Sequence, residues 1–420
     1  MLYTDLSLSS LYPSTIFSIG LRSVRLKLTY NYKHKQEHPL LSEMISPCSF
    51  PRLMTYLDAN ATEPLRPCAA DAMLEATRFV GNPSSIHTAG RAARALLENA
   101  RNTIARALGA DPLNCIFTSG GTEANALALH GLSAGRRFLV GRTEHDAVRQ
   151  SVPDHAPVEW LEVDTTGQVR LDLLEHSLAQ PGALPAFVCL MFANNETGVL
   201  HPMVEVVRLC RHYGAHLHVD AVQAVGRVEL SLLEQHFDSL ACSGHKIGGP
   251  KGAGALLIQN TTHTSFTPLF VGGGQEQGRR GGTPALPSIV GFAAALQDAL
   301  QHPVTYEPLH HRLEQAARSL GAVICGEKAP RLGNTSCLAF PGQKAQTQLM
   351  RLDLEGICVS AGSACSSGKV TISHVLEAMG LGDLAGQAIR VSLPWNVTEA
   401  DIDHFIQTYT RLVATSTKTP

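Results

Sequence analysis

The chain has 420 residues, of which 44% are hydrophobic and 17% are charged, a composition typical of a globular protein with more than one domain. Its formal net charge of −2 argues against a general surface for nucleic acid, so we expect no nucleic-acid partner. No apolar run approaches the roughly 18 residues that a membrane-spanning helix needs, so we do not expect this chain to span or bind a membrane.

Residues 1–53 differ in composition from the rest of the chain. They are rich in Ser, carry basic residues and few acidic ones, and show neither strand alternation nor a capped helix. This composition is typical of an organelle transit peptide. It also fits a spurious extension upstream of a true start at Met54, which we favour because TYLDANAT follows at once. Either way, we exclude this segment from the predicted fold.

Short apolar runs alternate with helical patterns from Met54 to about residue 300. The strand-like runs are 115–119, 137–141, 158–163, 186–193, 215–219, 238–243 and 252–258. This alternation predicts an α/β fold, with a largely parallel, doubly wound sheet that carries helices on both faces. The pattern changes to α+β after residue 300. We predict an N-terminal segment at 54–66 that packs with the small domain, a large domain at 67–300 and a small C-terminal domain at 301–420.

The ten cysteines include no C-x-x-C pair, which argues against a zinc knuckle or a thioredoxin-type motif. Most lie in apolar runs, as Cys115, Cys189 and Cys337 do, and are interpreted as small buried hydrophobic residues. The pattern suits a reducing cytoplasm, so we expect a cytoplasmic protein, or an organellar one only if residues 1–53 are a transit peptide. The histidines are not spaced as metal ligands, and we expect no metal.

Polar residues gather directly after the predicted strands. In open α/β sheets, ligands bind outside the carboxyl ends of the strands. We therefore expect one ligand-binding edge, to which five consecutive strands contribute. The candidate residues are Gly121, Thr122 and Glu123, His145, Asn194, Asn195 and Glu196, Asp220 and Gln223, and Ser243, Gly244, His245 and Lys246.

Two lysines stand between Met54 and residue 300, and both lie in SGHKIGGPKG. A bond to an aldehyde cofactor needs an amine that can lose its proton. Lys246 follows a predicted strand directly, whereas Lys251 lies in the next Gly/Pro turn. The alternative, that both are surface lysines on a loop, stays open at this point.

Two further features fit pyridoxal phosphate (PLP), an aldehyde cofactor whose ring nitrogen needs a carboxylate partner. Asp220 ends an apolar run, where burial would penalise an unpaired charge, although it could simply cap the next segment. The Gly120–Gly121–Thr122 turn joins a strand to a helix, where backbone N–H groups can bind phosphate. Any strand-to-helix turn can also use two glycines.

Three more residues could take part in chemistry. His145 could stack on a planar ring and exchange protons near neutral pH, although a lone histidine is more often structural. Cys365 lies in SAGSACSSGK, a flexible polar setting where an exposed thiol either reacts or is harmless. Arg390 could bind a substrate carboxylate through two hydrogen bonds, or could form a surface ion pair.

Taken together, these motifs resemble those of the cysteine desulfurases, within the class V aminotransferase-like PLP enzymes. The resemblance covers about residues 55–410 and rests on several motifs in the same order. They include YLDANAT (56–62), FTSGGTEANALAL (117–129), TEHDAV (143–148), NNETG (194–198), HVDAVQAVG (218–226), SGHKIGGPKGAGAL (243–256), GGGQEQGRRGGT (272–283), SAGSACSSG (360–368) and IRVSL (389–393).

The resemblance implies fold-type I, a homodimer and a set of residue roles. Lys246 would hold PLP and then remove the Cα proton of the substrate, and Cys365 would receive its sulfur. The implied cofactor ligands are Asp220 at the ring nitrogen, Gln223 at the phenolic oxygen, His145 stacked on the ring, Gly121, Thr122, Ser243 and His245 at the phosphate, and Thr283 from the partner subunit. Asn195 and Arg390 would bind the substrate carboxylate.

The implied reaction converts L-cysteine to L-alanine and leaves a persulfide on Cys365. The sulfur would pass to an acceptor, such as a scaffold protein for iron–sulfur clusters, with Cys365 as a transient cluster ligand. Alternatives are a selenocysteine lyase, another class V aminotransferase, or a non-catalytic sulfur-trafficking protein. An aminotransferase would not need Cys365.

Overall fold

The computed structural model describes residues 54–153, 156–232, 234–259, 266–362 and 372–416, and all of them lie in the unit Arg52–Pro420. The extension at 1–53 and the predicted sulfur acceptor Cys365 lie outside the described residues.

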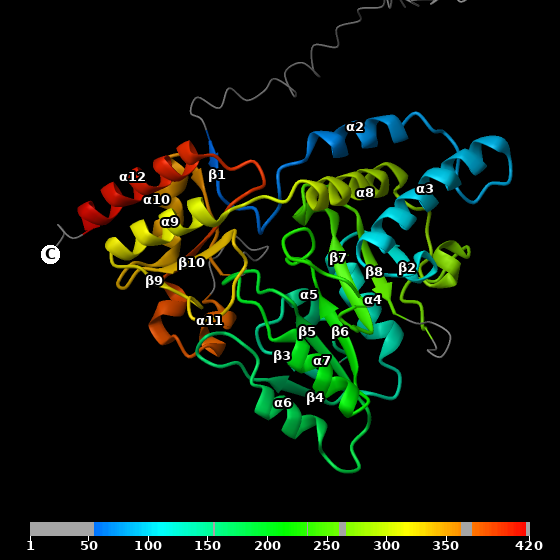
Figure 1. Cartoon of the computed structure of the whole chain (residues 1–420), viewed down its shortest axis with the longest axis horizontal. Coiled ribbons are helices and arrows are strands. Elements are labelled where there is room, and N and C mark those ends of the chain that lie inside the picture. Colours follow the sequence, from blue (N-terminus) through cyan, green and yellow to red (C-terminus); the bar gives the residue numbers. More distant parts are fainter. Residues whose placement is uncertain (1–53, 154–155, 233, 260–265, 363–371, 417–420) are drawn as a thin grey trace, which may run out of the picture. The chain divides into compact units, whose positions relative to one another are not determined.

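A seven-stranded sheet organises the first part of the described chain (Figure 1). The strands β7, β6, β5, β3 and β4 run parallel in that spatial order, whereas β8 runs antiparallel to both of its neighbours, β2 and β7. The strand bounds are β2 Cys115–Thr118, β3 Arg137–Gly141, β4 Val158–Leu161, β5 Ala186–Met191, β6 His216–Asp220, β7 Ser239–Ser243 and β8 Gly254–Ile258. The predicted, largely parallel α/β fold is therefore confirmed.

Helices cover both faces of this sheet because alternate strand residues point to opposite sides. In β5, Val188 and Leu190 belong to one hydrophobic cluster, whereas Phe187 and Cys189 belong to another. The first cluster packs against α3 (Thr88–Ala107), α6 (Leu171–Leu178), α7 (Met203–His212) and α8 (Leu286–Gln301). The second packs against α4 (Gly121–Leu132), near which the short α5 (Asp146–Arg149) lies. The helix α2 (Pro67–Ala76) packs on α8.

The later part of the chain forms two smaller sheets. An antiparallel sheet has the order β12–β10–β9, and β1 pairs in parallel with β11. Their bounds are β1 Thr55–Tyr56, β9 Val323–Ile324, β10 Thr335–Ala339, β11 Ile357–Cys358 and β12 Ala388–Ser392. A core that contains Leu57, Phe340 and Tyr409 packs them against α9 (Glu307–Ser319), α10 (Ala345–Leu354) and α12 (Glu399–Ser416). A further cluster lies under α11 (His374–Ala378). The domain boundaries at residues 66 and 300 stay a prediction.

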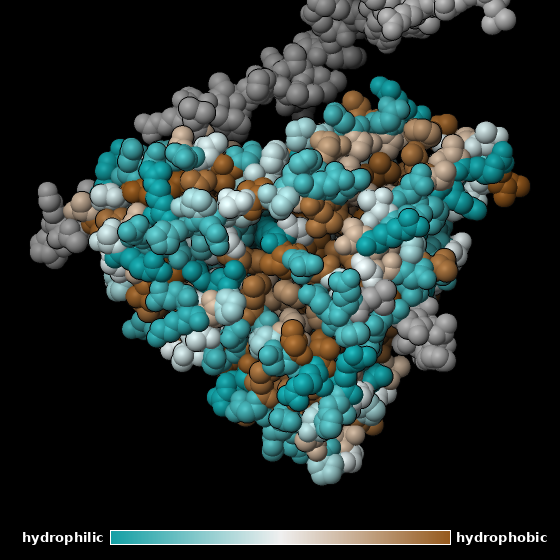
Figure 2. Space-filling model, viewed as in Figure 1, coloured by the Kyte–Doolittle hydropathy of each residue, from teal (hydrophilic) through white to brown (hydrophobic). Residues whose placement is uncertain are grey.

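The structure adds helices that the strand-and-helix pattern did not predict, among them α2, α3 and α8. The buried face of α3 is formed largely by small residues, with Ala93, Leu97, Ala100 and Ile104 spaced by three or four positions. Figure 2 shows hydrophilic side chains over much of the visible surfaces of α9, α12 and α3.

In the part of the chain that the structure describes, no helix combines the length and hydropathy that crossing a membrane requires.

Candidate active site

A cavity of about 620 Å³ opens at the carboxyl ends of β3, β5, β6 and β7. This is the edge at which an open α/β sheet binds its ligands. Ten of the residues singled out from the sequence line it, namely Gly121, Thr122, His145, Asn195, Asp220, Gln223, Ser243, His245, Lys246 and Arg390.

The amine of Lys246 lies in this cavity, three residues beyond the end of β7. Its Nζ donates to the backbone carbonyl oxygens of Asn60 and Ala61, the latter at 2.9 Å. Burial, reinforced by the positive charges of Arg390 and Arg227, lowers the pKa of Lys246 to about 7. A neutral amine is therefore well populated near neutral pH. By contrast, Lys251 is exposed and does not line the cavity.

Asp220 is a buried carboxylate at the end of β6. Its Oδ1 accepts from the N–H of Val222 at 2.9 Å, and its Oδ2 accepts from Nδ2 of Asn125 at 2.7 Å. Burial raises the pKa of Asp220, while the Val222 bond and the nearby His145 oppose the rise. Asp220 therefore caps the following turn and also lines the cavity, while its pairing with a cofactor ring stays a prediction. A cation in the cavity would favour its ionised form.

The other polar end of the cavity is the first turn of α4. Gly121 begins this helix, and a Cβ atom at that position would lie 2.6 Å from Cγ2 of Val222. Ser243 is buried beside this turn, and its Oγ has no hydrogen-bond partner among the described residues. Free N–H groups at a helix start, the hydroxyl of Thr122 and an unpaired buried hydroxyl form a suitable site for a phosphate group.

Arg390 enters the cavity from β12. Its guanidinium is buried, donating to Oδ1 of Asp58 at 2.8 Å and to the carbonyl oxygen of Asn195 at 3.2 Å. Its Nε has no partner among the described residues. Arg390 therefore does form an ion pair, but a buried one, and it keeps a free N–H group for an acceptor.

Histidine and amide side chains complete the lining. Nδ1 of His145 accepts from the N–H of Ala147 at 3.1 Å, which places any proton of the neutral ring on Nε2. Burial lowers the pKa of His245 to about 4, and its Nδ1 lies 3.2 Å from Oγ1 of Thr62. Nε2 of Gln223 donates to the carbonyl oxygen of Asn60 at 3.0 Å.

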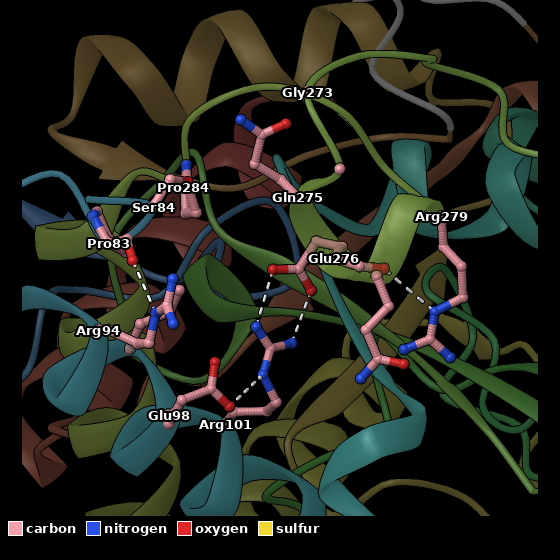
Figure 3. A pocket seen from close by; sticks show the side chains of 13 residues that line it. Pro83, Ser84, Arg94, Glu98, Arg101, Gly273, Gln275, Glu276, Arg279 and Pro284 are labelled. Carbon is pink, nitrogen blue, oxygen red and sulfur yellow. Dashed lines mark hydrogen bonds and ion pairs between the residues drawn. The ribbon is translucent and has the colours of Figure 1, made fainter. Parts of the chain in front are cut away.

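Thr283 is not part of this cavity. It is exposed and lines a separate space of about 90 Å³ with Ser119 and Arg280. A neighbouring cavity of about 360 Å³ is lined by a buried ion pair, in which the guanidinium of Arg101 donates to the carboxylate of Glu276 at 2.6 and 2.8 Å (Figure 3). Oε2 of Glu276 also accepts from the N–H of Phe117 in β2. The loop that carries Thr283 is thus attached to the strand that leads into the Gly120–Gly121 turn.

Among the cavity residues without an assigned role in the sequence interpretation, Asn60 and Asn125 form hydrogen bonds with residues that had one. Asn60 lies in the YLDANAT motif, and its carbonyl oxygen accepts from Lys246 and Gln223. Asn125 lies one helical turn after Gly121, so both residues share one face of α4. That four-residue spacing was the signal that could have identified Asn125.

The cavity combines the chemical groups that PLP needs. It has an amine with a low pKa for the aldehyde, a buried carboxylate for the ring nitrogen, and an anion site for the phosphate. The unpaired Oγ of Ser243, beside the first turn of α4, fits a phosphate bound at that turn. Among the described residues, no three His, Cys, Asp or Glu side chains gather closely enough to hold a metal ion.

Comparison with known proteins agrees with this chemistry. The aminotransferase class-V family model matches residues 55–405. A cysteine desulfurase of Nostoc sp. is 40% identical over 375 residues, which cover 85% of this chain and 92% of that protein. The structure of a NifS-like protein from Rickettsia africae superposes with a TM-score of 0.79 at 33% identity, covering 86% of this chain and 100% of that one.

A further solved structure, described as SspA in complex with cysteine, has a TM-score of 0.71 at 28% identity and covers 81% of this chain and 98% of that one. The family model and the relatives each extend over most of the chain, and the resemblance seen in the sequence is confirmed. This chain belongs to the aminotransferase class-V family and, within it, to the cysteine desulfurases.

Proposed function

We propose that this cavity binds PLP through Lys246 and removes sulfur from L-cysteine, giving L-alanine. The observation that carries the proposal is the amine of Lys246, with its pKa lowered to about 7, in one cavity with buried Asp220 and the unpaired hydroxyl of Ser243. An amine, a carboxylate and an anion site in one cavity suit PLP better than a cofactor without an aldehyde.

The cofactor ligands follow from the contacts of the cavity. Lys246 would bind the aldehyde, Asp220 would pair with the ring nitrogen, and Gln223 would reach the phenolic oxygen. Gly121, Thr122, Ser243 and His245 would hold the phosphate, and His145 would lie against the ring. When bound, PLP withdraws electrons from the amino-acid substrate and so weakens the bonds to its α-carbon.

Thr283 would complete the phosphate site from the partner subunit of a homodimer. Its exposure and its separation from its own chain's cavity are compatible with that role. The loop that bears it is held by the Arg101–Glu276 pair, so it can present Thr283 outward in a fixed position. The homodimer is inferred from the family resemblance, and the cytoplasmic location is inferred from the pattern of cysteines in the sequence.

Substrate recognition would centre on Arg390. Its free Nε and its position in the cavity suit the carboxylate of an amino acid. Asp58 accepts from Nη2 of the guanidinium and so helps to fix its plane. The side chain of Asn195, which lines the same cavity, would donate the second hydrogen bond to the carboxylate.

Proton transfer would use Lys246 and His145. The neutral Nζ of Lys246 would accept the proton from Cα of the bound amino acid, because the pKa of this amine lies near neutral pH. The Nε2 of His145 can exchange a proton with the reacting groups, since Nδ1 is already engaged with the N–H of Ala147.

The sulfur would pass to Cys365. Its thiolate attacks the sulfur of the substrate, an S–S bond forms, and the bond between that sulfur and Cβ breaks. The electron pair goes to the carbon side and Cβ gains a proton, so that alanine leaves and Cys365 carries a persulfide. An acceptor protein, such as an iron–sulfur scaffold, would then take the sulfur.

The test is to incubate the PLP-loaded protein with L-cysteine, quantify alanine, and search for one added sulfur on the Cys365 peptide by mass spectrometry. Alanine together with the persulfide would support the proposal. A Cys365→Ser variant should bind PLP normally and lose sulfur transfer. If that variant still turned the amino acid over at the full rate, an aminotransferase-type reaction without a thiol would replace the proposal.

A further inference from the structure

Buried polar side chains form a continuous chain of hydrogen bonds behind Asp220. Nδ2 of Asn125 donates to Oδ2 of Asp220 at 2.7 Å, and Oδ1 of Asn125 lies 2.9 Å from Nε2 of His218. Nδ1 of His218 lies 2.9 Å from Oγ of Ser239, which is itself 3.2 Å from Nε2 of His216. Asn125, His218 and Ser239 are fully buried.

The hydrogen bonds of this chain have only one consistent direction. An ionised Asp220 can only accept, so the amide nitrogen of Asn125 faces it and the amide oxygen must accept from His218. The neutral ring of His218 then carries its proton on Nε2 and accepts at Nδ1 from Ser239. Burial lowers the pKa values of His218 and His216 to about 3, which keeps both rings neutral.

This direction brings an N–H group to Oδ2 of Asp220, while the N–H of Val222 serves Oδ1. Donors to both oxygens favour the ionised form of a carboxylate that burial would otherwise protonate. They also fix the plane of the carboxylate while each oxygen keeps a lone pair for the cavity. The ring of His218 is held in turn by stacking on Phe187, with centroids 6.3 Å apart.

We propose that Asn125 and His218 are positioning residues that keep Asp220 ionised and oriented toward the ring nitrogen of PLP. The inference rests on the proposed function, because it concerns the carboxylate that would pair with the cofactor. The proposal gives a function to this buried chain of hydrogen bonds. Apolar side chains could fill the same space, and buried polar groups lower the stability of the fold unless all of them are hydrogen-bonded.

The experiment is a double-mutant cycle on the full chain, with PLP affinity and the absorbance spectrum of the bound cofactor as readouts. The variants are Asn125→Leu, which keeps the number and branching of the side-chain heavy atoms but removes the donor, and His218→Phe, which keeps an aromatic ring for stacking. Each is made alone and together with Asp220→Asn. His201→Phe is the matched control, because His201 is also buried but bonds to the N–H of Val169 instead.

With Asp220 intact, Asn125→Leu should weaken PLP binding about tenfold, the worth of a hydrogen bond to a charged group, and His218→Phe, which removes a bond to the neutral amide of Asn125, should weaken it less. The spectrum should shift toward the form with an unprotonated ring nitrogen. Combined with Asp220→Asn, the same changes should add less than about twofold. His218→Gln, whose amide can donate to Asn125, should stay within about threefold of the unmodified protein. The control His201→Phe should leave both readouts unchanged.

Unchanged affinity and spectrum in Asn125→Leu would overturn the inference. So would an equal loss in the Asp220→Asn background, since that would indicate a general packing defect. Asn125→Leu tests the link next to Asp220, so the result stands even if His218→Phe prevents folding. If the unmodified protein does not bind PLP, the proposed function itself fails; if it binds and the variants bind equally well, only this inference fails.

Discussion

The buried amine of Lys246 predicts an unusual dependence of stability on pH in the PLP-free protein. Burial lowers the pKa of Lys246 from 10.5 to about 7 in the folded chain. Between these two values the unfolded chain binds a proton that the folded chain does not. The free energy of unfolding therefore contains a contribution that rises with pH across this window. Replacing Lys246 by Met removes the titrating group and with it this contribution.

The size of the effect follows from the shift. Each pKa unit corresponds to about 1.4 kcal/mol, so between about pH 7 and about pH 9.5 the contribution reaches at most about 3 kcal/mol. The Lys246 side chain is partly exposed to the cavity, and water there screens its charge. As the pH rises across this window, we expect the free energy of unfolding of the unmodified protein to increase by about 1 to 3 kcal/mol more than that of Lys246→Met.

The assay is urea unfolding of both PLP-free proteins at the two pH values. The bonds from Nζ to the carbonyl oxygens of Asn60 and Ala61 are missing from the variant at both pH values, so their loss cancels in the difference. All other groups titrate in both proteins. Parallel dependence of stability on pH in the two proteins would refute the claim that Lys246 is held near neutral pH.

Three further predictions concern the cavity and its supports. Gly121→Ala brings a Cβ atom within 2.6 Å of Cγ2 of Val222, so PLP titration should show affinity reduced by about tenfold, and unchanged affinity would argue against a phosphate at this turn. Glu276→Gln leaves the buried guanidinium of Arg101 with only the half-exposed carboxylate of Glu98, so urea unfolding should show a loss of about 3 kcal/mol, and a loss below about 1 kcal/mol would contradict the contribution of the Arg101–Glu276 pair. Arg390→Gln should raise KM for L-cysteine about 100-fold with a smaller effect on kcat, and steady-state kinetics with an unchanged KM would exclude the carboxylate role.

The sequence predicted the cavity best where parallel strands end. Strand ends that are distant along the chain meet at one edge of a parallel sheet, so Lys246, Asp220 and Gly121 could be grouped without knowledge of their contacts. The sequence favoured Lys246 over Lys251 because Lys246 is nearer to the strand end, three residues after β7 as against eight.

The contacts that cross the chain could not be predicted in this way. Asn60 precedes Lys246 by 186 residues, and their hydrogen bond depends on where the segment after β1 passes over the large sheet. Likewise, the sequence left open whether Arg390 lies in a surface ion pair. Its burial comes from the pairing of β12 with β10 and from Asp58, which is 332 residues away. No local periodicity records such contacts.

The sequence pattern also could not predict that β8 runs antiparallel to its neighbours. Its residues are buried and apolar like those of the parallel strands, and direction leaves no mark on composition. The turn from β7 to β8 carries Lys246 near its start and Lys251 near its end. The short, glycine-rich connection between these strands is compatible with a hairpin-like return, because parallel strands need a longer crossover.

The central claim, that Lys246 holds the cofactor, is tested most directly by fixing PLP to its lysine with borohydride and locating the label by mass spectrometry. The account predicts one pyridoxyl group per chain, on Lys246, in both the unmodified protein and Lys251→Ala, and no label in Lys246→Ala. A label on Lys251, or a label that survives in Lys246→Ala, would contradict it.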